Sequence, residues 1–413
     1  MNERTTCLIA GGGPAGMILG LLLARAGVEV TVLEKHADFL RDFRGDTVHP
    51  STLTLLDELG LGEKFAALPH NKLSQVAIPG RDGQNLVFAD LSTLRVPHPY
   101  VAMVPQWDLL DLLAEAGRAE PRFHLRMNTE VVGLLREHGR VTGVRYRTVE
   151  GLGGEIRATL TVGCDGRWSV VRREAGLRPR EFPVPIDTWW FRLPREGGER
   201  PTLIPGMRRG HFAVVIPREE YFQIAYLAKK GLDAQLRAEG LDAFRARIAT
   251  VLPELSGRLA RLTSMDDVKH LDVRLDLLRR WHVDGALCIG DAAHAMSPVG
   301  GVGINLAVQD AVATARLLAG PLLTGRVGRR ELARVHRRRL LPTVVVQLIQ
   351  RIMHRTVIRP VIEGHREGPP KSVLRVLNLF PPLRRVPARL IGVGLLPEHA
   401  PAFARRPPDR QAA

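Results

Sequence analysis

The sequence predicts an α/β fold: a Rossmann-like domain with an interleaved antiparallel-sheet domain, followed by C-terminal helices. Three observations predict it. A glycine-rich turn joins an apolar strand to an apolar helix near the N-terminus, residues 181–230 alternate between apolar and polar side chains, and residues beyond 341 repeat apolar side chains at helical spacing. The first pattern is typical of a parallel sheet, the second of an antiparallel sheet and the third of helices.

The N-terminal elements form a β-α-β unit. A short apolar run over 5–10 ends in Gly-Gly-Gly-Pro-Ala-Gly, and residues 17–27 are apolar at helical spacing up to Gly27. The next stretch, 28–35, alternates and is rich in valine, which favours a strand. Strand, glycine turn, helix and strand in this order predict two parallel strands.

Helices and short strands follow. Helices are expected over 50–62, where a glycine ends the pattern, and over 105–118, which Pro105 opens. Residues 73–104 mix short strands with Gly and Pro turns, and strands are expected at 129–136 and 140–148 around a His-Gly turn.

The pattern of apolar and polar residues changes in the middle of the chain. Three alternating stretches between 187 and 228 predict antiparallel strands, a helix is expected over 233–250, and a buried-strand pattern returns at 286–295. We therefore expect a Rossmann-like domain from residues 1–72, 100–180 and 276–325, a sheet domain from 73–99 and 181–275, and a helical segment over 326–413.

Composition excludes several classes of protein. The chain has 413 residues, 45% of them hydrophobic and 25% charged, which is ordinary for a globular protein of two or three domains. Apolar runs fall short of the roughly eighteen residues of a membrane span, and a strand begins too early for a signal peptide, so a cytoplasmic location is expected. Cys7, Cys164 and Cys288 lie far apart without a CxxC, so we expect neither a zinc site nor a disulfide framework.

Positive charge gathers at the C-terminal end. The net charge is +16, yet residues 321–413 hold 19 Lys and Arg against 5 Asp and Glu, a net +14, and the rest of the chain is nearly neutral. Such a patch can meet membrane lipid, nucleic acid or an acidic partner. Because no nucleic-acid motif accompanies the charge, nucleic-acid binding is not expected.

The first motif is Gly11-x-Gly13-x-x-Gly16, between the first strand and helix. Gly11 permits a tight turn, Gly13 lets the backbone approach a pyrophosphate, and Gly16 lets helix and strand pack closely, with the helix N-terminus supplying N–H donors. Glu34 ends the next strand, where a carboxylate can hold the hydroxyls of an adenosine ribose. The motif predicts dinucleotide binding without separating FAD from NAD.

Two further motifs follow in order. Gly163-Cys164-Asp165-Gly166 continues to Arg172 and, taken alone, can equally be a β-turn. Gly290-Asp291-Ala292-Ala293-His294 ends a buried strand, and Ser297–Asn305 then lead through three glycines into a helix. The N-terminus of that helix can stabilise negative charge on an electron-rich ring.

Taken together in this order, the three motifs resemble those of the class A FAD-dependent aromatic monooxygenases, which include para-hydroxybenzoate hydroxylase, polyketide aromatic hydroxylases and ubiquinone-pathway hydroxylases. The resemblance covers roughly residues 5–325. It implies FAD as cofactor, NAD(P)H as co-substrate, and transfer of one oxygen atom of O2 to a hydrophobic aromatic or quinone-like substrate through a flavin C4a-hydroperoxide. The cofactor carries that chemistry, so no metal or protein nucleophile is expected.

The resemblance also implies which residues contact FAD. The first motif would cradle the pyrophosphate and Glu34 the ribose, Asp165 would serve both FAD and NAD(P)H, and the loop from Pro298 to Asn305 would lie against the isoalloxazine ring. The full implied set is Gly11, Gly13, Pro14, Ala15, Gly16, Glu34, Lys35, Arg44, Gln106, Val131, Asp165, Asp291, Pro298, Gly301, Val302, Gly303, Ile304 and Asn305.

A phenolic substrate reacts faster as the phenolate, so a base or proton relay is expected near the substrate sheet. Each candidate can equally be structural, because an alternating strand buries half of its side chains. The candidates are His49, whose loop should approach the flavin, and the sheet residues Arg192, His211, Tyr221 and Tyr226.

The region 341–362 leaves two interpretations open. Leu341, Val345, Leu348, Ile349 and Ile352 recur at helical spacing opposite a polar face. This apolar face can dock weakly on an anionic membrane to collect a lipophilic substrate, which would make the protein a membrane-surface hydroxylase of a quinone precursor. It can also pack on the body of the protein and close the substrate cavity, which we favour because amphipathic helices usually face a core.

Alternatives to the monooxygenase reaction share the FAD domain. A reductase or dehydrogenase of the prenyl-lipid type would consume no O2, and a flavin-binding sensor would catalyse nothing. A flavin halogenase would need Trp-x-Trp-x-Ile-Pro and a catalytic lysine, whereas residues 189–194 read Trp-Trp-Phe-Arg-Leu-Pro. The sequence pattern does not determine the substrate, the choice between NADH and NADPH, or whether the protein is a monomer or a homodimer.

Overall fold

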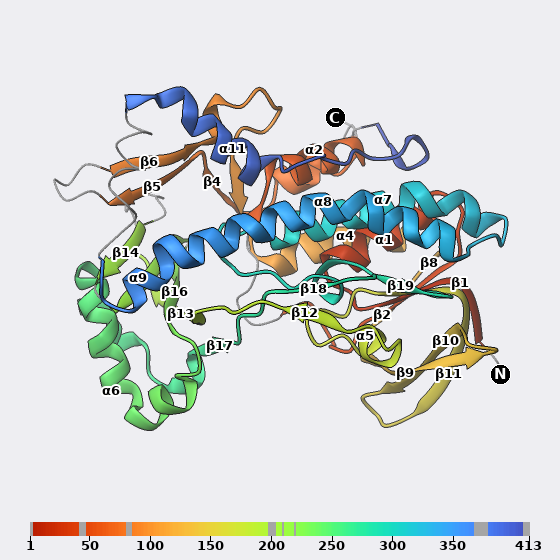
Figure 1. Ribbon diagram of the computed structural model, residues 1–413, viewed down its shortest axis with the longest axis horizontal. Helices are drawn as coiled ribbons and strands as arrows, with labels where there is room; N and C mark the ends of the chain where they lie inside the picture. Colours follow the sequence, from red (N-terminus) through yellow and green to blue (C-terminus); the bar gives the residue numbers. More distant parts are fainter. Residues whose placement is uncertain are drawn as a thin grey trace.

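A parallel sheet organises the larger part of the molecule (Figure 1). This is a computed structural model, and it describes residues 3–40, 47–79, 85–196, 204–208, 210–218, 220–366 and 379–407. The strand order is β19-β20-β11-β1-β2-β8, and β20, β11, β1, β2 and β8 run parallel. Their bounds are β1 Glu3–Ala10, β2 Val30–Leu33, β8 Phe123–Arg126, β11 Gly153–Gly163, β19 His282–Val283 and β20 Ala286–Cys288.

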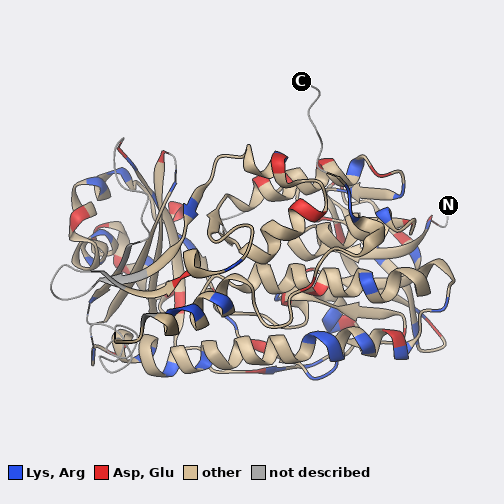
Figure 2. Ribbon diagram, turned by 90° about the horizontal axis from the view of Figure 1, so that it is seen from above, with Lys and Arg blue, Asp and Glu red and all other residues tan. Residues whose placement is uncertain are grey.

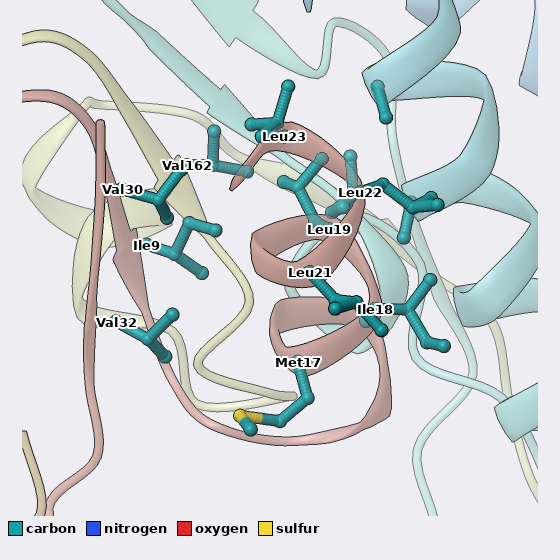
Figure 3. Close-up of a cluster of buried hydrophobic side chains, with 14 of the residues drawn as sticks. Ile9, Met17, Ile18, Leu19, Leu21, Leu22, Leu23, Val30, Val32 and Val162 are labelled. Atoms are coloured by element: carbon teal, nitrogen blue, oxygen red, sulfur yellow. The ribbon is translucent and has the colours of Figure 1, made fainter. Parts of the chain in front are cut away.

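The predicted β-α-β unit is confirmed. Helix α1, Pro14–Arg25, is buried on nearly every side, which explains why its sequence is apolar all round. Figure 3 shows Met17 and Leu19 near Ile9 and Val32 of the neighbouring strands. Cys7, at 0% exposure, belongs to the same core, and the three cysteines carry free thiols.

The β-hairpin after β8 forms as expected. Strands β9, Thr129–Glu137, and β10, Arg140–Thr148, pair antiparallel, and β10 continues onto β11. His138 and Gly139 between them have φ of 47° and 79°, the conformation of a tight hairpin turn. Strand β11 therefore pairs parallel with β1 and antiparallel with β10.

Helices cover the sheet. The helix expected over 50–62 is two helices, α2 and α3, because Gly60 at φ 74° ends the first. The bounds are α2 Pro50–Glu58, α3 Gly62–Ala66, α4 Gln106–Arg118, α5 Val170–Glu174 and α7 Gly303–Leu323. By length and composition α7 could cross a membrane, but 72% of its most apolar window is buried, as in the core helix of a folded domain.

The antiparallel sheet has the order β14-β15-β16-β13-β17. The strands are β13 Ile186–Pro194, β14 Ile204–Arg208, β15 His211–Pro217, β16 Tyr221–Lys229 and β17 Lys269–Leu271. The helix expected at 233–250 is α6, Asp233–Val251, with a kink at Gly240, whose φ is 85°. The pattern of alternation thus predicted β13, β15 and β16 correctly, whereas β14 and β17 had not been expected as strands.

Two apolar clusters lie on opposite faces of this sheet. Trp189, Phe191 and Tyr226 pack with Phe244 of α6. Trp190, Phe212 and Leu227 pack with Met103 and residues from the C-terminal part of the chain. We call the first the α6 face and the second the inner face, since neighbouring strand residues point to opposite sides.

Short strands connect the two sheets. A three-stranded sheet is formed by β3 Thr47–Val48, β7 Val101–Met103 and β4 Asn71–Leu73; β5 Gln75–Pro79 pairs with β6 Asn85–Asp90, and β12 Pro179–Glu181 pairs with β18 Asp276–Leu278. Figure 1 shows the β5–β6 hairpin beside β14, in the same half of the molecule as α6.

The C-terminal part is helical, but its long helix is oriented against our expectation. Helix α8, Arg329–Met353, continues into a π-helical turn, His354–Ile358, and α9, Arg359–Ile362; α11 is Arg385–Gly392. The buried side of α8 is polar, whereas Leu341, Leu348 and Ile352 are 55%, 50% and 52% exposed. The favoured interpretation, that the apolar face packs on the body, was wrong, because the body offers polar groups that the polar face bonds. The buried polar residues are Arg339, Thr343, Gln347, Gln350 and His354.

Candidate functional site

The three motifs meet at one edge of the parallel sheet. They follow β1, β11 and β20, and the registers Ala10↔Gly163 and Gly163↔Cys288 place the ends of these strands side by side. In open α/β sheets ligands bind at this carboxyl edge. Motifs separated by more than a hundred residues thus form one surface.

The first motif has the geometry that a pyrophosphate needs. Gly11 has φ 100°, and an added Cβ there would lie 2.5 Å from the carbonyl oxygen of Cys164. An added Cβ on Gly16 would lie 2.0 Å from the carbonyl oxygen of Gly11, whereas one on Gly13 would meet nothing within 4 Å. Gly13 caps α1 without a side-chain hydrogen bond, so the first N–H groups of this helix face open space.

Glu34 lies beside this turn. Its side chain is 2% exposed, and its carboxylate accepts hydrogen bonds from the backbone N–H of Gly12 at 2.8 Å and of His36 at 3.1 Å. A carboxylate oxygen can accept more than one hydrogen bond, so Glu34 is of the right chemical kind to accept from the hydroxyls of a ribose. The residues present therefore fit the adenosine and pyrophosphate parts of FAD.

The second and third motifs contact each other. Arg167 donates to Asp291 at 3.5 Å and to the carbonyl oxygen of Asp272 at 3.0 Å. Asp165 accepts from the hydroxyl of Ser169 and from the N–H of Val171, so it also holds the start of α5. Burial raises the pKa of Asp165, and the Ser169 hydrogen bond opposes that rise.

Gly290 lets the third motif sit between two helices. Its φ is 58°, and an added Cβ would lie 3.1 Å from the Cβ of Ala307 in α7 and 3.5 Å from that of Ala15 in α1. Asp291 follows in the short 3-10 turn Gly290–Ala292 and is half-buried. The structure thus brings the N-terminal ends of α1 and α7 to the same place.

The loop from Pro298 to Asn305 is held from the other side. The hydroxyl of Thr47 and Nε2 of His49 both donate to the carbonyl oxygen of Gly301, at 2.8 and 3.0 Å. The amide oxygen of Asn305 accepts from Ser51 and Thr52 of α2, each at 2.8 Å. Burial lowers the pKa of His49, so its imidazole is neutral and donates through Nε2. The structure places His49 as a support of the loop.

Helix α8 holds the preceding residues. The amide of Gln350 donates to the carbonyl oxygens of Ser297 and Val299 at 2.8 and 2.9 Å. His354 Nε2 lies 2.8 Å from the Ser297 hydroxyl, and burial lowers the pKa of His354 to about 4. The polar face of α8 and the turn that follows it therefore pack against this loop and hold it by hydrogen bonds.

A buried ionic cluster ties the third motif to the same helix. Asp310 of α7 accepts from Gly290 N–H at 3.1 Å, from Arg339 Nε at 2.9 Å and from His294 Nε2 at 2.5 Å. Burial raises the pKa of Asp310, but His294 and Arg339 outweigh it, and the pKa lies below its ordinary value. Sequence reasoning assigned His294 only a supporting part in the motif and missed Asp310 and Arg339, whose spacing from it, 16 and 45 positions, has no local signature.

Two of the four candidates in the antiparallel sheet lie on its inner face. Arg192 pairs in register with Gln223, and its guanidinium lies 4.5 Å from the ring centre of Tyr221 and 5.8 Å from that of Trp107. Trp107 follows Gln106 at the start of α4. Arg192 and Tyr221 therefore border the segment of Gln106, one of the residues expected to contact FAD.

The other two candidates lie on the α6 face. His211 Nδ1 is 2.8 Å from the Tyr226 hydroxyl, and Tyr226 packs against Trp189 and Phe244. Burial raises the pKa of Tyr226 to about 12 and lowers that of His211. Both side chains are thus neutral at pH 7 and bonded to each other, on the side of the sheet away from the motifs.

Sequence reasoning missed a polar pair on the inner face. Arg218 and Gln223 are 4% and 1% exposed, and Nε and Nη2 of Arg218 donate to the amide oxygen of Gln223 at 3.3 and 3.2 Å. These bonds fix which amide atom is oxygen, because the guanidinium only donates. Among the residues that the structure describes, none is a hydrogen-bond partner of the amide nitrogen of Gln223. A glutamine inside the apolar stretch YFQIAYLA was the available signal.

The remaining predicted contacts are distributed along the same edge. Gln106 is half-buried at the first turn of α4, Val131 is buried in β9, and Lys35 is exposed after β2. Lys35 borders an open depression of about 480 Å³ that Asn128 and Glu130 also line. Arg44 lies outside the described residues.

Comparison with known proteins identifies the relatives of this chain. The family described as FAD binding domain matches residues 4–351. The chain is 35% identical to 6-methylpretetramide 4-monooxygenase of Streptomyces rimosus, over 80% of this chain and 78% of the relative. It is 31% identical to the 12-dehydrotetracycline 5-monooxygenase/anhydrotetracycline 6-monooxygenase of the same species, over 75% of this chain and 61% of that protein.

Solved structures show the same fold. The anhydrotetracycline hydroxylase OxyS of Streptomyces rimosus superimposes with a TM-score of 0.74 at 24% identity, covering 94% of this chain and 76% of that one. The Rossmann-like domain, the antiparallel sheet and the C-terminal helices therefore form an arrangement already seen in the solved structure of this hydroxylase.

Proposed function

The chain belongs to the FAD-binding-domain family and is an FAD-dependent monooxygenase, and on that premise we propose that it hydroxylates a fused-ring phenolic substrate of the polyketide type. The observation that carries the proposal is the convergence of the three motifs at the carboxyl edge, opposite the inner face of the antiparallel sheet. The alternative of a prenyl-lipid reductase is not favoured, because the relatives are monooxygenases.

FAD, when bound, accepts hydride from NAD(P)H and activates O2, so this chain has to hold, orient and shield it. We assign the pyrophosphate to the N-terminus of α1 and the ribose to Glu34, since both present donors and acceptors of the right kind. The Pro298–Asn305 loop would support the ring, with the backbone N–H groups at the start of α7 available to negative charge.

Arg218 and Gln223 would orient the substrate. A buried amide N–H without a partner costs about 1–3 kcal/mol, so an oxygen atom from outside the chain should complete the Gln223 site. A ring carbonyl or phenolate oxygen fits, because Arg218 adds positive charge beside it. Arg192 and Tyr221 would border the same space, and a proton relay through either stays a prediction.

The apolar residues of the inner face support a large aromatic substrate. Trp190, Phe212, Ile216 and Leu227 come from neighbouring strands, and Val299 of the predicted flavin loop packs against this cluster. A wall of aromatic and aliphatic side chains with one polar pair is the usual composition of a site for a hydrophobic small molecule. The tetracyclic substrates named for two relatives have that character.

The test is spectroscopic and kinetic. The purified protein should show a bound-flavin spectrum, and oxidation of NADH or NADPH with O2 uptake should be stimulated more by tetracyclic phenols than by simple phenols or quinones. Stimulation by simple phenols alone would contradict the proposed substrate class. Oxidation without O2 uptake for every compound would favour the reductase. A cytoplasmic location, the choice between NADH and NADPH, and monomer against homodimer stay predictions.

A further inference from the structure

Helix α8 turns its apolar stripe outward. Leu341, Val344, Leu348 and Ile352 are 55%, 41%, 50% and 52% exposed and lie at spacings of three and four residues, so they share one face. Isolated exposed apolar residues are common, but four in one continuous row on a single helix are a patch.

The helix cannot rotate to bury this stripe. Its opposite face is fixed by Arg339 bonded to Asp310, Gln347 bonded to the carbonyl oxygen of Asp276, and Gln350 bonded to Ser297. Rotation would leave these buried groups without partners, and a buried polar group without a hydrogen bond is strongly destabilising. The outward direction of the stripe is therefore a property of the fold.

Arginines stand at both ends of the stripe. Arg330, Arg334 and Arg337 precede it, Arg351 and Arg355 lie at its far end with Arg359 just beyond, and all are exposed. Figure 2 shows Lys and Arg towards both ends of the long helix, with an uncharged stretch between them. From 329 to 363 the only acids are Glu331 and Glu363, and Glu331 bonds the backbone N–H of Gly328.

We propose that the outward face of α8 docks on an anionic membrane surface. An amphipathic helix with apolar residues on one stripe and arginines beside it lies in the plane of a bilayer interface, where long arginine side chains reach the headgroups. The twelve residues from Leu341 to Ile352 span about 16 Å, so the whole stripe can enter the interface with the helix parallel to it.

A second copy of this chain fits the surface poorly. Because arginines flank the stripe at both ends, parallel and antiparallel pairing of two α8 helices both place arginine against arginine. A protein partner would also need about 800 Å² of contact, and four half-exposed side chains provide only part of that. An anionic lipid surface offers negative charge along the whole length of the helix, and each basic residue near that surface adds to the attraction.

The experiment is flotation of the full-length, FAD-loaded protein with vesicles. We expect it to float with phosphatidylcholine/phosphatidylglycerol vesicles, to stay behind with phosphatidylcholine alone, and to dissociate as salt is raised. Leu341→Ser together with Leu348→Ser should abolish binding, and Arg334→Gln with Arg355→Gln should weaken it roughly tenfold or more.

Matched controls separate this surface from general adhesion. Val149→Ser with Leu152→Ser changes two apolar residues of similar exposure, 72% and 68%, outside the α8 face, and should leave binding unchanged. Circular dichroism and bound FAD should be unchanged in every variant, which separates lost binding from misfolding and from failure of the proposed function.

Four results would overturn the proposal. The first is no flotation of the wild-type protein with either vesicle, and the second is flotation that the paired leucine substitutions leave intact. The third is retention on immobilised polyglutamate without vesicle binding, which would make an acidic protein the partner. A dimer in sedimentation velocity that the leucine substitutions dissociate would assign the face to self-association.

Discussion

The carboxyl edge of the parallel sheet and the antiparallel sheet build their parts of the site in different ways. At the edge, the backbone makes the site: Gly11 and Gly16 are required because any side chain would collide with a carbonyl oxygen. In the antiparallel sheet, side chains make it, and a single strand such as β16 sends Tyr221 to one face and Tyr226 to the other. A site built from the backbone requires glycines at fixed positions, which can be recognised in the sequence. A site built from the side chains of alternating strands has no such signature, because the sequence does not show which face carries it.

The strongest test of this comparison is Gly11→Ala. Its Cβ would lie 2.5 Å from the Cys164 carbonyl oxygen, so the turn must move, and we expect loss of bound flavin absorbance with activity reduced on the order of 10²-fold or more. Gly139→Ala is the matched control, because Gly139 also has positive φ, 79°, but has open space around it. Equal flavin loss in both variants would show that backbone strain alone, and not the close approach, matters.

The second test concerns helix α8, which joins the two regions. Arg339→Met should lower the free energy of unfolding by about 3–5 kcal/mol in urea, because it leaves the buried carboxylate of Asp310 with less compensation. Arg337→Met, on the exposed side of the same helix, should change it by about 0.5 kcal/mol or less. Similar losses in both variants would mean that helix propensity dominates and that the buried pair contributes little.

The third test uses pH. The folded pKa of His354 is about 4 against 6.5 for the free side chain, so the unfolded chain binds this proton more tightly. The associated stability is complete above pH 6.5 and is lost as pH falls towards 4, by roughly 3 kcal/mol. Unfolding free energies of wild type and His354→Leu, compared from pH 7 to pH 4, should converge as pH falls. A difference independent of pH would contradict the assignment.

We expect the smallest effects from variants that compare the two faces of the antiparallel sheet. Arg218→Met, on the inner face, should raise KM for the aromatic substrate about 10- to 100-fold, since a hydrogen bond to a charged group contributes about 1.5–3 kcal/mol. Tyr226→Phe, on the α6 face, should leave kcat and KM unchanged and cost about 1 kcal/mol of stability. A loss of kcat in Tyr226→Phe, with its pH profile altered, would restore Tyr226 as a proton relay.

The amino-acid sequence by itself determined the parallel sheet, the order of its elements and the cofactor. The turn after β1, the strands β9, β10, β13, β15 and β16, and the helices α1 and α4 all follow from local rules: glycine where no side chain fits, and apolar residues at a period of two or near four. FAD followed from the resemblance of the three motifs, in their order, to those of the class A flavin monooxygenases, and the matching family model agrees with it.

Only the tertiary structure decided which faces are inside. It separated Arg192 and Tyr221 from His211 and Tyr226, found Arg218 with Gln223, and assembled Asp310, Arg339 and His294 from distant positions. It also showed that α8 packs on the body with its polar face, the opposite of our expectation. The reason is that Ser297, Asp276 and Asp310 offer buried polar groups that only the polar face can bond. Periodicity shows that a helix has two faces, but the choice between them depends on what the rest of the chain places opposite.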